Sequence, residues 1–220
     1  MALNDITRAG SYTYYDVRSV VLRKAFTLLG VSVIAAIATG YLALLTNFVN
    51  PTFSLIAFIA VFAGSFIIPN LNDGPVGYSA VVITGGLLGV AIVPSVAFYI
   101  GMGGVGVVVN ALVATAAIFI SLAAYAVITK KDFTRIGGIL TVALLAAVVV
   151  GLLNAFFIHS NIVSLGLAYL VALVSCGLIL YRLSIAVNSG IMSVTQLAFG
   201  LLIDVYNLFT SLLRIFASRD

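Results

Sequence analysis

The chain has little of what soluble enzymes and metalloproteins use. Its 220 residues include no glutamate, one cysteine (Cys176) and one histidine (His159), and only 7% of them are charged. A soluble domain of this length carries about 25% charged residues, so the composition excludes that class. A lone cysteine excludes disulfide frameworks and cysteine-ligated zinc sites, and a lone histidine argues against a histidine-rich metal site.

The same scarcity removes the common catalytic sets. Neither a Ser/His/Asp nor a Cys/His set is apparent, and Asp204 is the one acid deep in an apolar run, so paired carboxylates are missing there. Gly101–Gly106 matches the G-x-G-x-x-G pattern, but it joins two apolar runs and no acid follows it before Asp132. A dinucleotide site has a strand before this pattern and an acid about 20 residues after it. We therefore expect a turn there, no enzymatic activity and no cofactor.

Long apolar runs are what the chain does have. Hydrophobic residues make up 63% of it, and the mean hydropathy is +1.29. About 20 apolar residues cross the roughly 30 Å hydrocarbon core of a bilayer. Seven runs qualify, at approximately 25–48, 52–68, 77–95, 106–129, 136–158, 162–183 and 194–217.

These runs predict an all-α integral membrane protein: a seven-transmembrane-helix bundle forming one domain, 25–220, within the lipid bilayer. A polar tail, 1–24, precedes it; the tail is either unstructured or rests at the lipid headgroups through its tyrosines at 12–15. Small residues at helical spacing, such as Gly85 and Gly89, predict close packing between helices of the bundle.

The basic residues orient the chain in the membrane. Arg23 and Lys24 end the tail, and Lys130, Lys131 and Arg135 lie in the loop four crossings later, whereas the alternating loops contain no lysine or arginine. Cytoplasmic loops carry the excess of basic residues, so we expect a cytoplasmic N-terminus and, after seven crossings, a periplasmic C-terminus. The alternative is a last segment that dips in and returns. This clustering at segment ends also indicates that the net charge of +4 does not serve nucleic-acid binding.

Two charges lie within the apolar runs. Asp204 lies about ten residues into the last one, roughly 15 Å deep at 1.5 Å per residue. A carboxylate at that depth costs about 2.5–3.5 kcal/mol on insertion, so it should face protein or water. Arg182 lies near the end of the sixth run. It either extends to the headgroups or pairs with Asp204 on the neighbouring helix.

The last two segments resemble those of a known family. The stretches Gly177–Tyr181 and Asp204–Phe209 are similar to the last two helices of the Bax inhibitor-1 (TMBIM) family. Three more resemble its bacterial YccA-like branch: Val21–Lys24, Tyr125–Asp132 and Phe216–Asp220.

This resemblance implies a bundle in which the seventh helix is central and enclosed by the other six. In some members it also implies a calcium leak that protons control, because acids on helices six and seven share a proton and latch the pore. Asp204 matches the helix-seven acid, whereas Arg182 stands where the family has its helix-six acid. Tyr181, Tyr206 and Asn207 are further candidates for the latch or ion path.

The arginine changes what the latch would do. It cannot share a proton, and its charge favours the ionised form of Asp204. We therefore expect a permanently closed ionic latch, and the calcium-leak function becomes the alternative. The YccA-like branch implies another role: binding and restraining the membrane-anchored AAA+ protease FtsH in the bacterial inner membrane, for which we expect the tail to serve as the recognition element. A third hypothesis is a bundle in which the pair only fixes helix register.

Overall fold

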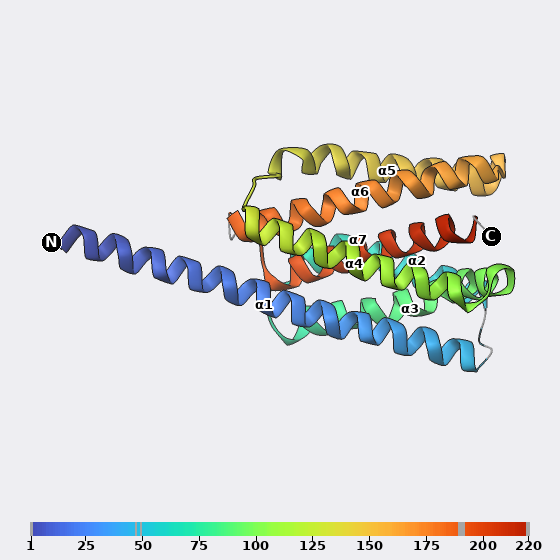
Figure 1. Cartoon of the computed structure of the whole chain (residues 1–220). Helices are drawn as coiled ribbons and strands as arrows, with labels where there is room; N and C mark the ends of the chain where they lie inside the picture. Colours follow the sequence, from blue (N-terminus) through green and yellow to red (C-terminus); the bar gives the residue numbers. More distant parts are fainter. Residues whose placement is uncertain (1, 47, 49, 189–191, 219–220) are drawn as a thin grey trace.

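Seven long helices form the bundle in the computed structural model, which describes residues 2–46, 48, 50–188 and 192–218, with side chains from residue 19 onward (Figure 1). All seven contain a stretch long and apolar enough to cross a membrane, which confirms the predicted all-α, seven-span class. They are α1 (Ala2–Leu45), α2 (Pro51–Ile67), α3 (Pro75–Gly103), α4 (Val105–Thr129), α5 (Gly137–Leu153), α6 (Asn161–Asn188) and α7 (Val194–Ala217). Short turns of helix accompany them: η1 (Ile68–Asn70), η2 (Thr134–Ile136) and η3 (Asn154–Ile158).

The last helix lies at the centre. α1, α3, α4 and α6 all pack against α7, whereas α5 packs on α6 and α2 packs on α3 (Figure 1). Four leucines of α7 are at most 1% exposed: Leu197, Leu201, Leu208 and Leu213. The central position of α7 agrees with the family resemblance, and four of the other six helices make its immediate surroundings.

A seam of small residues joins α1 to α3. Gly85 and Gly89 of α3 lie directly against the backbone of α1, at Ser32 and Ala36, where a side chain would collide with carbonyl oxygens. Across the same seam the Thr39 hydroxyl donates a hydrogen bond to the Gly86 carbonyl at 2.8 Å. The predicted close approach is therefore an intramolecular contact, and it anchors α1 to the rest of the bundle.

Three helix bounds differ from those expected. α1 begins at Ala2, so the polar tail is a helical continuation of the first span. α3 continues through Pro94 to Gly103, because a proline inside a membrane helix is tolerated, and only Gly104, with φ of 76°, makes the turn into α4. α6 runs to Asn188, beyond the expected end at 183, which places Arg182 inside the helix.

The two ends of the bundle differ in polarity. The connections at 71–74 and 130–133 and the start of α7 lie together at one end, which we call the charged end. α7 ends at Ala217, at the opposite end of the bundle from its start (Figure 1). A re-entrant last segment, the alternative considered from the sequence, does not match this arrangement.

We predict that Gly89→Ala destabilises the bundle by about 1–3 kcal/mol, because the added methyl group overlaps the Ala36 carbonyl and forces α1 and α3 apart. The thermal unfolding midpoint in detergent, followed by circular dichroism, should fall by roughly 3–10 °C. Gly30→Ala on α1 is the control, since no atom lies within 4 Å of a methyl group there. Equal midpoints for the two variants would contradict a close-packed seam.

Candidate functional site

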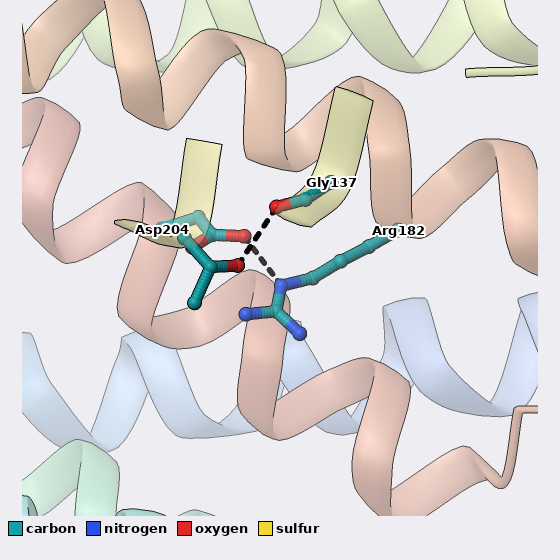
Figure 2. A network of polar contacts seen from close by, with 4 residues as sticks. Gly137, Arg182 and Asp204 are labelled. Carbon is teal, nitrogen blue, oxygen red and sulfur yellow. Dashed lines mark hydrogen bonds and ion pairs between the residues drawn. The ribbon is translucent and has the colours of Figure 1, made fainter. Parts of the chain in front are cut away.

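An ion pair joins the two helices that carry the intramembrane charges. The Arg182 Nε of α6 donates to the Asp204 Oδ2 of α7 at 2.6 Å, as Figure 2 shows. The Asp204 side chain is fully buried, whereas 25% of the Arg182 side chain is exposed. Of the two interpretations open for Arg182, the structure shows the pair.

Helix geometry brings these side chains to the same depth. Arg182 lies six residues before the end of α6, about 9 Å from the charged end, and Asp204 lies about 15 Å from it. Side chains lean toward the N-terminus of their own helix. Because α6 and α7 run in opposite directions, Arg182 leans deeper and Asp204 leans back toward it. The length of the arginine then covers the difference of about 6 Å.

A glycine makes room for the arginine. Gly200 lies one turn before Asp204 on the same face of α7, and a methyl group at this position would overlap the Arg182 guanidinium. The guanidinium therefore lies flat against the backbone of α7. Sequence analysis missed Gly200, although its spacing of four residues from Asp204 was a signal that could have identified it.

The pair leaves one carboxylate oxygen without a partner. Among the described residues, Asp204 Oδ1 and Ser175 Oγ are the buried side-chain oxygens that have no hydrogen bond. Arg182 neutralises the charge of the carboxylate, and it cannot deliver a proton to it. The arrangement can thus hold α6 against α7 through a charged contact. Within the same described residues, no group of three or more His, Cys or acidic side chains gathers as a metal site would require.

The other predicted candidates lie around the pair without joining it. The ring of Tyr181 packs over Gly137 at the start of α5, where a methyl group would overlap the ring. Figure 2 draws Gly137 in the same view as the ion pair, and the Gly137 carbonyl accepts a hydrogen bond from Thr141 Oγ1 at 2.9 Å. Tyr206 and Asn207 are half-buried on the turn of α7 that follows Asp204. The contact between Tyr181 and Gly137 thus holds the start of α5 against α6.

The predicted topology determinants are exposed. They belong to α1 and to the connection between α4 and α5: Arg23, Lys24, Lys130, Lys131 and Arg135. The connection itself is bound to α6, because Ser184 Oγ donates to the Lys131 carbonyl at 3.0 Å and accepts from the Phe133 amide at 2.9 Å. Ser184 is 1% exposed, so this loop is fixed to the bundle from within.

A second acid binds the start of α7. Asp73, in the connection between η1 and α3, accepts from the Val194 amide at 3.0 Å, the Thr195 amide at 2.8 Å and the Thr195 hydroxyl at 2.9 Å. Burial by itself raises the pKa of the Asp73 carboxyl, but the hydrogen bonds from Thr195 and Val194 outweigh it and hold the pKa below its usual value. Sequence analysis did not identify this acid, since its partners are more than 120 residues away.

We predict that Arg182→Met destabilises the protein by about 3–5 kcal/mol, because it leaves the fully buried Asp204 carboxylate without its counter-charge. Arg182→Met combined with Asp204→Leu should recover most of that loss, since a buried ion pair can be replaced by apolar side chains of similar size. Unfolding in mixed micelles with increasing SDS measures both. Wild-type stability of the single variant would show that the pair contributes nothing to the fold.

Comparison with known proteins covers almost the whole chain. Residues 18–220 match the family described as "Inhibitor of apoptosis-promoting Bax1". "Modulator of FtsH protease YccA" of Escherichia coli K12 is 27% identical over 91% of each chain. An uncharacterized membrane protein of Vibrio cholerae is 29% identical over 89% of this chain and 87% of its own, and "Protein lifeguard 4" of the mouse is 29% identical over 90% and 84%. With the seven-helix bundle and the acid on its central helix, this match establishes that the chain belongs to the Bax inhibitor-1 family of membrane proteins.

Proposed function

We propose that this protein is a multi-pass protein of the bacterial inner membrane that binds and restrains a membrane-anchored AAA+ protease of the FtsH type. The observation that carries the proposal is the similarity to the Escherichia coli protein named as a modulator of that protease, which extends over 91% of both chains. A likeness that covers most of both chains, together with a family match over residues 18–220, favours a shared role of the whole bundle. A second Escherichia coli relative is named an inner membrane protein, which supports the location.

The N-terminal part of α1 is the element that we assign to the protease. It continues the first membrane span, which begins at Ser19, by 17 residues of helix, or about 26 Å. It projects beyond the bundle at the end where α6 and α7 meet, as Figure 1 shows. By the distribution of lysine and arginine, this end is cytoplasmic, on the side where a soluble ATPase domain would work.

The restraint follows from the way in which α1 is held. A partner that grips the projecting helix pulls on α1, and α1 is bound to α3 through the seam at Gly85 and Gly89. The ion pair between Arg182 and Asp204 in turn holds α6 against the central helix. The projecting part of α1 therefore gives the protease a segment to bind, while the bundle resists extraction from the membrane. A bound chain of this kind occupies the protease and is degraded slowly.

We predict that cells overproducing the full chain degrade a known membrane substrate of the protease more slowly, and that deletion of residues 2–16 abolishes this effect because the segment that binds the protease is lost. Pulse–chase measurement of the substrate half-life tests it. A version with residues 2–16 in shuffled order controls for length and composition. An undiminished effect of the deleted chain would exclude the tail as the recognition element, and the absence of any effect from the full chain would overturn the proposal.

An ion leak is the second candidate, and the fully buried acid on the central helix favours it. In this candidate the contact of Arg182 with Asp204 acts as a latch that stays closed, since the guanidinium is always charged and its charge favours the ionised form of the acid. Calcium or protons would pass along α7 only when the contact between α6 and α7 opens. The tail would play no part in such a leak, which separates the two candidates.

We predict for this candidate that Asp204→Asn raises calcium flux in proteoliposomes that contain a calcium-sensitive dye, because the amide removes the charge that holds Arg182 in place. Deletion of residues 2–16 should leave the flux unchanged. If Asp204→Asn alters neither flux nor stability, the latch hypothesis fails. If it lowers stability without changing flux, the pair is a structural contact only.

A further inference from the structure

Two sets of polar contacts bind the central helix to other parts of the chain at different positions along its axis. We call these two sets the ties. At its first turn, Asp73 receives hydrogen bonds from Val194 and Thr195. Nine residues further along, Asp204 pairs with Arg182. The two ties are about 14 Å apart along α7 and reach different elements: the connection that precedes α3, and α6.

The first tie has the form of a helix cap supplied by another part of the chain. Ser193 caps α7 locally by accepting from the Gln196 amide at 3.1 Å. Asp73 accepts hydrogen bonds from the two amides before that of Gln196, those of Val194 and Thr195. The free amides in the first turn of α7 are thus bound by a local acceptor and a distant one. The backbone of α3 packs directly against Thr195, because a methyl group on Gly77, at the start of α3, would overlap the Thr195 side chain. Asp73 thus joins α7 to the start of α3.

Apolar packing alone does not define the height of such a helix, by which we mean its position along its own axis relative to the neighbouring helices. Five of the fourteen buried residues of α7 are leucines, and a shift by one turn, about 5.4 Å, would place Leu197 where Leu201 had been. Lipid and leucine are equally apolar, so little free energy separates these positions. Directional polar contacts discriminate between them, as a buried polar residue does in a coiled coil.

We propose that Asp73 is a positioning residue that sets the height of α7 in the bundle, together with the Arg182–Asp204 pair. Either tie holds the helix at its observed height. α7 can shift only after both are released. An event at the charged end that displaces Asp73 therefore removes one of the two constraints, and the position of α7 then depends on the Arg182–Asp204 pair alone. This inference concerns the bundle itself and holds whether the protein restrains a protease or conducts ions.

The test measures how well α7 is protected when each tie is removed. Cys176 is replaced by serine, and Ala198, which is fully buried one turn from the start of α7, becomes the single reporter through Ala198→Cys. The rate of labelling by N-ethylmaleimide in mild detergent is compared for Asp73→Ala, Asp204→Leu and the double variant. Asp132→Asn is the control, because it removes an acid at the same end whose hydrogen bonds go to Thr134 and not to α7.

If the ties share one role, each single variant should raise the labelling rate modestly, and the double variant should exceed the product of the two increases by at least about tenfold. Independent sites at this separation should multiply to within about a factor of two, and that result would overturn the proposal. Thermal unfolding midpoints of the same four proteins give a second measure. A drop in the double variant larger than the sum of the single drops supports a shared role, and an additive drop counts against it.

Discussion

The bundle depends on the neutralisation of one charge inside an apolar surrounding. Asp204 is fully buried on the helix that four others surround. The bilayer core contains no water that could solvate its charge. Arg182 supplies the counter-charge from α6. Other features of the site serve this contact: the continuation of α6 past Arg182, the glycine that leaves space for the guanidinium, and the opposite directions of the two helices.

The kind of counter-charge decides what the contact can do. Two carboxyl groups in close contact share a proton, so their attraction comes and goes with pH. An arginine cannot share a proton with a carboxyl group, because the guanidinium keeps its own, and its charge favours the ionised form of the acid. In this chain the acid of the central helix is thus paired with a permanent positive charge. A bundle of this kind fits the proposed function, in which the protein stays folded while the protease binds it.

Composition and spacing predicted most of the fold and part of the site. The apolar runs and their connections predicted seven spans, since the length required to cross a bilayer leaves few alternatives. The depth of Asp204 and Arg182 predicted that they could meet, because position along a helix converts directly into distance. The ends of α3 and α6 were harder to place: Pro94 suggests a stop that the bundle overrides, and the last turn of α6 contains polar residues that bind the neighbouring loop.

The contacts that the sequence did not predict are those between distant parts of the chain. Asp73 stands among turn-forming residues, and only the fold brings it to the first turn of α7. Ser184 likewise looks like one more small residue of an apolar helix until the connection at 131–133 lies over it. The sequence around each partner of such a hydrogen bond contains no pattern that would indicate the distant contact.

The central place of α7 also bears on biosynthesis. Of the seven helices, the one that the others surround is the last to leave the ribosome. Until it arrives, α1, α3, α4 and α6 have no common partner, and Arg182 waits in the membrane without its acid. Packing around α7 thus follows the synthesis of the other six helices. A chain that stops short of Val194 lacks the helix that these four share, and its Arg182 has no counter-charge on α7.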